Sequence, residues 1–199
     1  MSGGAGPGAD ALVVAAPLHV EALALRRGDP SLRVVRTGMG RARAERAAAK
    51  LQADPARALA VGGVCGSLEP ALVPGDVLVA EALLAPDGTL VRRLEVDALC
   101  DALSALGLSP QRGALIGAER LDVHGRERER MRASGARAVD MESVWLAAGA
   151  GARPLAVLRV VSDGPGHELL SLALVRNGLA ALRALRRAAP ALGRWAQMH

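Results

Sequence analysis

Short apolar runs alternate along the chain with stretches whose apolar residues recur three and four positions apart. The runs are typical of strands buried in a sheet, and the spaced positions are typical of amphipathic helices. We predict strands at residues 11–16, 33–36, 58–61, 77–80, 114–116 and 155–161. We predict helices at residues 18–27, 44–51, 99–106, 141–150 and 171–187, and a loop with a charged helix within 119–136. This alternation predicts an α/β domain with a central, mostly parallel or mixed, twisted sheet flanked by helices.

The length of 199 residues suits a single domain. Residues 1–10 are rich in glycine and predict a flexible tail, which leaves residues 11–199 as the domain. The tail has no basic start, so it does not resemble a signal peptide, and the apolar runs are too short to span a bilayer. Two cysteines, Cys65 and Cys100, do not make a disulfide framework. These features predict a soluble cytoplasmic protein without an integral membrane segment.

Charge and aromatic content narrow the range of partners. The formal net charge is +5, but the densest charged run, residues 126–130, alternates in sign, which is typical of a solvated helix face. Arginines near the C-terminus, at 183, 186, 187 and 194, are more one-sided and are candidates for a contact with a partner or a membrane. The chain has no Phe, no Tyr and only two Trp, so modules that stack nucleobases on aromatic rings are excluded. We therefore expect no nucleic-acid partner.

Polar or glycine-rich segments follow four of the predicted strands. They lie around Glu21, at residues 38–40, at residues 62–67 and at residues 162–163. The ends of parallel strands open onto a crevice in which α/β domains bind ligands. Each segment alone is also compatible with an ordinary turn, but the four together predict a shared site.

Three other kinds of site are alternatives to this shared site. The glycines Gly38 and Gly40 suggest dinucleotide binding, but Arg43 occupies the position of the third glycine of that motif. The acidic residue that would bind the ribose is also missing from the end of the next strand. The pair at residues 167–168 begins like a zinc-protease motif but lacks the second histidine, so no metal site is predicted. Cys65 is either a nucleophile on a glycine-rich turn or, as we prefer, a small buried thiol.

Four motifs in a fixed order resemble the superfamily of purine nucleoside phosphorylases and methylthioadenosine/S-adenosylhomocysteine nucleosidases. They are the first strand with Glu21, the glycine-rich segment at residues 62–68 with the turn at residues 74–77, the Asp-Met-Glu segment at residues 140–142, and the Arg-x-x-Ser-Asp strand end at residues 159–163. The segment at residues 138–143 and the Leu/Arg-rich tail are most similar to the hopanoid-associated phosphorylase-like branch. Futalosine hydrolases and the nucleosidases are close relatives.

The resemblance implies cleavage of the N-glycosidic bond of a purine-type nucleoside, through an oxocarbenium-like transition state. It assigns proton donation to the base to Asp163, ribose binding to Glu142 beside Met141, and orientation of water to Glu21. Helix capping at Glu142 and Asp163 is the structural alternative. For Arg159, inside its strand, an internal ion pair is preferred to a ligand contact.

Further residues complete the predicted site. Substrate contacts are expected from Gly63, Cys65, Gly66, Leu121 and Ser162. A phosphate co-substrate would be held by Arg41 and Gly40 near a helix N-terminus, although for Arg41 a solvated surface position is slightly preferred. No other cofactor is expected, and hydrolysis and phosphorolysis remain open.

The scarcity of aromatic residues departs from the family pattern. Relatives often stack an aromatic ring on the purine from the segment that here reads Ile116 to Val123. Leu121, Val123 or Arg120 would have to take that role, or Trp145 would have to lie near the site. The alternatives are a non-catalytic or redirected member that serves as an interaction subunit and, third, a dinucleotide-binding protein. A homodimer or larger homo-oligomer is expected, with Trp145 as the candidate for burial at the interface.

Overall fold

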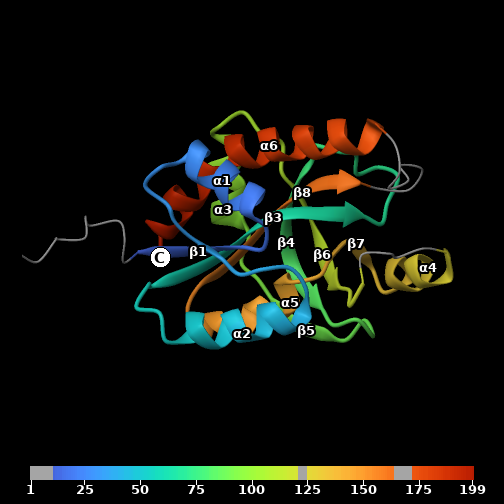
Figure 1. Ribbon diagram of the computed structural model, residues 1–199, viewed down its shortest axis with the longest axis horizontal. Helices are drawn as coiled ribbons and strands as arrows, with labels where there is room; N and C mark the ends of the chain where they lie inside the picture. The colour runs from blue at the N-terminus through green and yellow to red at the C-terminus, as the bar shows by residue number, and fades with distance from the viewer. Residues whose placement is uncertain (1–10, 121–124, 164–171) are drawn as a thin grey trace, which may run out of the picture.

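The computed structural model describes the backbone of residues 11–120, 125–163 and 172–199, and the side chains of all of these except 172–175. Within this part of the chain, eight strands form one mixed sheet with helices on both faces (Figure 1). The strands are β1 (Leu12–Ala16), β2 (Arg33–Arg36), β3 (Ala58–Ser67), β4 (Val77–Leu84), β5 (Leu90–Arg93), β6 (Gln111–Gly117), β7 (Ala136–Asp140) and β8 (Leu155–Asp163). The helices are α1 (His19–Gly28), α2 (Arg41–Gln52), α3 (Asp97–Ser104), α4 (Gly125–Ala133), α5 (Ser143–Leu146), the 3-10 helix η1 (Ala147–Ala150) and α6 (Leu172–Ala196).

The strand pairs close into a ring. Strand β3 pairs with β7 and β8, β4 pairs with β6 and β8, and β6 pairs with β7. Strands β1 and β2 extend the sheet in parallel beyond β3, and β5 lies antiparallel on β4 at the other edge. Because β1, β2, β3 and β8 run parallel, their carboxyl ends point to the same side of the molecule. The end of β7 meets the end of β3 from the opposite direction, with Val139 opposite Gly66.

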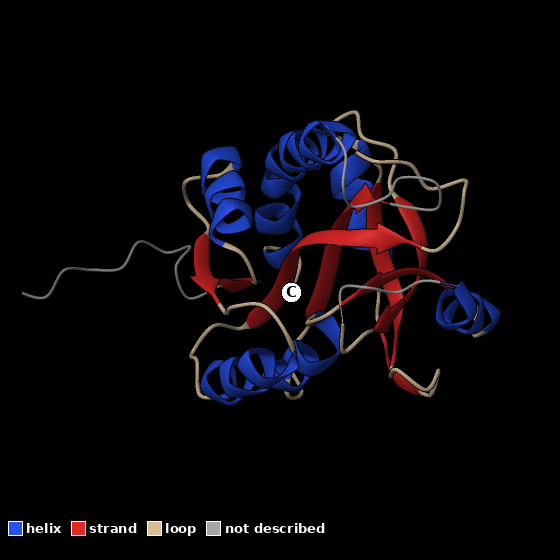
Figure 2. Ribbon diagram, turned by 45° about the vertical axis from the view of Figure 1, so that its right-hand side comes forward, coloured by secondary structure: helices blue, strands red, loops and turns tan. Residues whose placement is uncertain are grey.

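Two helical layers cover the sheet (Figure 2). Helices α1, α3 and α6 lie on one face, and α2 with α5 and η1 lies on the other. The core between them is filled almost wholly by Leu, Val and Ala. Gly28 brings the end of α1 close to α6, because a side chain there would collide with the backbone of Arg186. The bulky exception in this core is Trp195 of α6, which is 1% exposed.

The predicted α/β class, the single domain and the mixed sheet are confirmed. Every predicted strand and helix exists, but several boundaries were wrong. Strands β3 and β8 continue through the glycine-rich run and through Asp163, so these segments are strand ends rather than turns. The predicted helix at residues 141–150 is only the short α5 followed by η1, and the predicted helix at residues 171–187 extends to Ala196. Strands β5 and β7 were not predicted.

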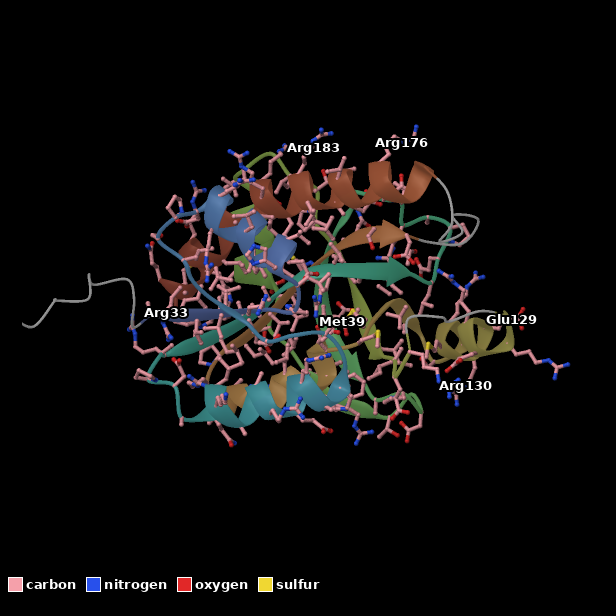
Figure 3. All side chains as sticks on the ribbon, viewed as in Figure 1. Arg33, Met39, Glu129, Arg130, Arg176 and Arg183 are labelled. Atoms are coloured by element: carbon pink, nitrogen blue, oxygen red, sulfur yellow. The ribbon has the colours of Figure 1, made fainter. Side chains whose placement is uncertain are left out.

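The charged segments lie at the surface. Helix α4 exposes most of its charged side chains and buries only Met131, as the alternating charges predicted. Arginines on α6 are also exposed, and Figure 3 shows Arg176 and Arg183 pointing away from the rest of the molecule. None of the described helices combines the length and the apolar character needed to cross a membrane. The predicted tail, residues 1–10, lies outside the described residues.

Candidate active site

Glu21 lies in the first turn of α1 and is only 2% exposed. Its Oε1 accepts a hydrogen bond from the backbone N–H of Val64 at 2.8 Å, and its Oε2 accepts one from Leu18 at 2.6 Å. The first bond ties α1 to the glycine-rich half of β3. Burial raises the pKa of Glu21, and the charge of Arg159 together with the two hydrogen bonds partly offsets that rise.

Arg159 is fully buried in β8 and forms an ion pair with Asp140, the last residue of β7, at 2.5 Å. Its Nε and Nη2 also donate to Oγ of Ser143, at 3.1 and 2.9 Å. The predicted internal ion pair of Arg159 is therefore confirmed. The carboxylate of Asp140 in turn accepts hydrogen bonds from the backbone of Glu142 and Ser143, and so it caps α5.

The remaining nitrogen of Arg159, Nη1, has no hydrogen-bond partner among the described residues, although it is buried. It faces Gly63, where an added Cβ would collide with Nη1 and would lie 2.6 Å from Oε1 of Glu21. A buried N–H without an acceptor is costly. The absence of a side chain at Gly63 therefore lets Nη1 of Arg159 and the carboxyl of Glu21 lie directly against the backbone of β3.

Glu142 is buried at the start of α5, but its carboxylate does not cap that helix. Its Oε1 instead accepts a hydrogen bond at 2.8 Å from the backbone N–H of Gly40, at the start of α2. Burial raises the pKa of Glu142 to about 7, although the charge of Arg159 opposes the rise. The neighbouring negative charge of Asp140 adds to it.

Asp163 ends β8 and is half-buried. Its Oδ1 accepts a hydrogen bond from the hydroxyl of Ser162 at 2.8 Å, and its Oδ2 would lie 3.2 Å from a Cβ added at Gly66. The same hydroxyl lies 3.2 Å from the backbone oxygen of Cys65. Gly66 therefore leaves room for the carboxylate of Asp163, and Ser162 orients it.

The four predicted segments come together around β3. Glu21 and Glu142 hydrogen-bond to Val64 and Gly40, and Asp163 lies against Gly66. The thiol of Cys65 lies among them, fully buried, and its pKa is raised by burial. A buried, protonated thiol is a poor nucleophile, which supports the structural interpretation of Cys65. Met141 is half-buried beside the cluster, and Leu121 lies outside the described residues.

Arg41, predicted to bind phosphate, is engaged elsewhere. Its side chain is about half exposed and pairs with Glu45 at 2.8 Å and with Glu119 at 2.9 Å. Its guanidinium lies over the ring of Trp145, 5.7 Å from the centroid. The N–H of Gly40 is already bonded to Glu142. Neither predicted phosphate ligand is therefore free in this structure.

Sequence reasoning did not select Asp140 or Ser143, which fix Arg159 and the start of α5. The sequence did indicate such a partner, because an arginine inside a buried strand requires a buried acid nearby. Asp140 and Glu142 are candidates for that acid. The sequence did not show which acid lies opposite Arg159, because β7 was not predicted as a strand.

The buried ionisable groups of the site are mostly acidic. Glu21, Asp140 and Glu142 supply three carboxyl groups against the single guanidinium of Arg159, with Asp163 close by at the rim. A group of acids in excess over cations is suited to stabilise positive charge that develops in a transition state. The mixed sheet therefore carries a buried and predominantly acidic site beside the second half of β3.

The chain belongs to the phosphorylase superfamily, because the sequence model of that family matches residues 24–189. No curated protein matches it by sequence. Among solved structures, a mutant of Helicobacter pylori futalosine hydrolase matches with a TM-score of 0.79 and 16% identity, over 91% of this chain and 97% of that one.

Two nucleosidase structures are similar to the same degree. The Campylobacter jejuni 5'-methylthioadenosine/S-adenosylhomocysteine nucleosidase has a TM-score of 0.78 and 16% identity, over 90% of this chain and 97% of that chain. The Streptococcus pyogenes S-adenosylhomocysteine nucleosidase, in complex with 5-methylthiotubericidin, has a TM-score of 0.75 and 20% identity, over 96% and 98%. These similarities show the fold. The family match does not favour the dinucleotide-binding or the non-catalytic alternative.

Proposed function

We propose that this protein cleaves the N-glycosidic bond of a purine-type nucleoside. The observation that carries the proposal is the buried acid cluster, in which the charge of the fully buried Arg159 acts on both Glu21 and Glu142. Departure of the base leaves positive charge on the sugar, as in glycoside hydrolysis. A site with more carboxylates than cations stabilises that charge, and its burial strengthens the effect.

Three steps are assigned to three acids. Asp163 transfers a proton to N7 of the leaving base, so that the base departs neutral as the bond between base and sugar breaks. Glu142, when ionised, accepts hydrogen bonds from ribose hydroxyls, with Met141 beside the sugar. Glu21 accepts a proton from the water that attacks the anomeric carbon. Nη1 of Arg159 lies with Oε1 of Glu21 at Gly63, and the charge of Arg159 favours the ionised form of Glu21 that this step requires.

Family membership and the neighbouring structures support this assignment. Among the latter, one is named a futalosine hydrolase and several are named nucleosidases, and one of these holds the nucleoside analogue 5-methylthiotubericidin. The hopanoid-associated branch and a homodimer or larger assembly remain predictions. For the base, Trp145 is a candidate contact in addition to Leu121 and Arg120, because its ring lies 3.4 Å from a Cβ built at Gly117, where β6 ends.

Product analysis with a panel of purine nucleosides, each with and without inorganic phosphate, tests the proposal. We expect release of free base from at least one nucleoside. Free sugar formed without phosphate identifies hydrolysis, and sugar 1-phosphate identifies phosphorolysis. A folded protein that releases base from none of the panel, under either condition, would contradict the proposal.

A further inference from the structure

Helix α6 carries the positive excess of the whole chain, whose formal net charge is +5. Residues 172–199 contain no Asp or Glu, so residues 1–171 have equal numbers of acidic and basic side chains, histidine apart. The basic side chains of α6 are Arg176, Arg183, Arg186, Arg187 and Arg194. The surplus charge is therefore concentrated on one helix instead of being spread over the surface.

Three of these arginines form a stripe along the helix. With about 100° of rotation per residue, Arg176, Arg183 and Arg187 point within about 40° of one another, over about 16 Å of helix. All three are exposed. Figure 3 shows Arg176 and Arg183 pointing away from the rest of the molecule. The outer face of α6 is thus a row of guanidinium groups.

The arginines of α6 have no role inside the fold. Among the described residues, none of their side chains makes a hydrogen bond or an ion pair. Arginines elsewhere do, since Arg112 pairs with Asp97 and Arg137 with Glu69. A row of like charges without internal counter-ions attracts a large anionic partner.

The helices beside α6 do not neutralise the row. Helix α1 packs against α6, and its one acid, Glu21, is buried. Arg27, near the end of α1, is exposed, and the glycine after it lies against the backbone of Arg186. Helix α3 also packs against α6 and exposes Asp97 and Asp101, but neither pairs with an arginine of α6. The basic surface therefore extends from α6 onto the end of α1.

An apolar side chain is exposed within this surface. Leu179 lies within one turn of both Arg176 and Arg183 and is 49% exposed. Basic side chains with an exposed apolar residue among them suit the headgroup region of a membrane, where the phosphates and the start of the acyl chains meet. The backbone of a nucleic acid offers phosphates but no apolar layer, and the row has no aromatic ring that could stack on a base.

We propose that the outer face of α6 docks this protein on the surface of a membrane that contains acidic phospholipids. Arg176, Arg183 and Arg187 bind lipid phosphates, since guanidinium groups form strong charge-assisted hydrogen bonds with them. Leu179 contacts the apolar boundary below the headgroups. Each arginine near such a surface strengthens binding by about fivefold. The inference does not depend on the proposed cleavage of nucleosides.

Co-sedimentation with lipid vesicles at low ionic strength tests the docking surface. We expect binding to vesicles of phosphatidylglycerol and phosphatidylcholine in equal parts, little binding to phosphatidylcholine alone, and release by KCl. The double variant Arg183→Gln with Arg187→Gln should bind the acidic vesicles roughly tenfold more weakly or worse. Arg46→Gln with Arg93→Gln removes the same charge from exposed positions on α2 and β5 and should bind as the wild type does.

Both double variants should unfold in urea as the wild type does, because none of these side chains makes a hydrogen bond or an ion pair with a described residue. Leu179→Ser keeps the net charge and should weaken vesicle binding by roughly threefold or more. The inference is overturned if the wild type does not bind acidic vesicles, if it binds neutral vesicles equally well, or if the two double variants bind alike. Binding of a short RNA duplex through Arg183 and Arg187, without binding to acidic vesicles, also overturns it and assigns the surface to nucleic acid.

Discussion

At the residue scale, Glu142 shows how a site sets the charge of an acid. Its carboxyl is buried beside Asp140 and Glu21, and both burial and these negative charges raise its pKa to about 7. Arg159 and the N–H of Gly40 oppose the rise without cancelling it. The result is an acid that changes charge near neutral pH, although an exposed glutamate has a pKa of about 4.3.

This shift predicts a pH-dependent loss of stability. Between about pH 4.5 and 7 the folded protein keeps the proton on Glu142 while the unfolded chain releases it, so rising pH favours unfolding. In Glu142→Gln that contribution is absent, and the variant should gain up to about 3 kcal/mol relative to the wild type as the pH rises from 5 to 7.5. Urea unfolding at both pH values measures it, with Glu95→Gln at the surface as control. A difference that does not change with pH contradicts the shift.

Candidate acids were easier to predict from the sequence than their partners. Glu21, Glu142 and Asp163 each follow a recognisable apolar strand or motif, and the structure brings them to one site. The partner of Arg159 depends on how β7 lies against β3, which is a long-range pairing that no local pattern shows. Likewise, the pairing of Arg41 with Glu119 links residues far apart in the sequence.

At the element scale, β3 determines the shape of the site. Gly63 and Gly66 in its second half leave space for Glu21, Arg159 and Asp163. Glycine usually weakens a strand, yet here β8 on one side and β7 on the other keep the run extended. The strand therefore places bare backbone at the centre of the acid cluster.

Filling one of these positions should damage the site. In Gly63→Ala the new methyl group would collide with Nη1 of Arg159 and lie 2.6 Å from Oε1 of Glu21, so both side chains must move. We expect a loss of stability of roughly 1–3 kcal/mol and a fall in nucleoside cleavage of roughly 100-fold. Unfolding and activity assays measure both effects.

Gly178→Ala is the matched control for this substitution. Gly178 lies inside α6, where an added Cβ meets nothing within 4 Å. The same exchange should there stabilise the protein by about 0.5–1 kcal/mol and leave cleavage unchanged. Equal effects of the two substitutions would show that the space at Gly63 has no special role.

The strands and helices with a buried apolar face could be predicted from the sequence. The short or exposed strands, and the helix that divides into α5 and η1, could not. Strand β5 is an edge strand of largely exposed residues, and the short β7 contains Arg137 and Asp140, so neither has a long apolar run. The predicted helix at residues 141–150 tightens to η1 and ends at Gly151, whose φ is +56°. The change from α5 to η1 falls where the segment packs against α2, and a Cβ added at Gly149 would lie 3.1 Å from the backbone oxygen of Ala48.

At the scale of the whole molecule, Arg159 connects separate parts of the fold. From β8 it reaches Asp140 at the end of β7 and Ser143 in α5, and it faces Glu21 in α1 across Gly63. It is the one cation in contact with the acid cluster among the described residues. Its removal leaves buried carboxyl groups without a compensating charge, which is among the most destabilising changes a core can undergo.

Arg159→Met should therefore destabilise the protein by about 3–5 kcal/mol near neutral pH. The cost should be smaller at pH 5 than at pH 8, because Glu142, whose pKa is raised to about 7, then carries a proton. Urea unfolding at the two pH values measures this. Arg112→Met, which removes an exposed ion pair with Asp97, should have little effect at either pH. A cost for Arg159→Met that is equally small would contradict the account of the cluster.

Asp163 is the proposed proton donor to the departing base, and cleavage by Asp163→Asn tests this role most directly. Asparagine keeps the shape of the side chain and can still accept the hydrogen bond from Ser162, but it has no proton to transfer. We predict that nucleoside cleavage falls by about 10²- to 10⁴-fold while the unfolding curve is unchanged. Asp101→Asn, an exposed aspartate on α3, should cleave as the wild type does. Undiminished cleavage by Asp163→Asn would contradict the assignment.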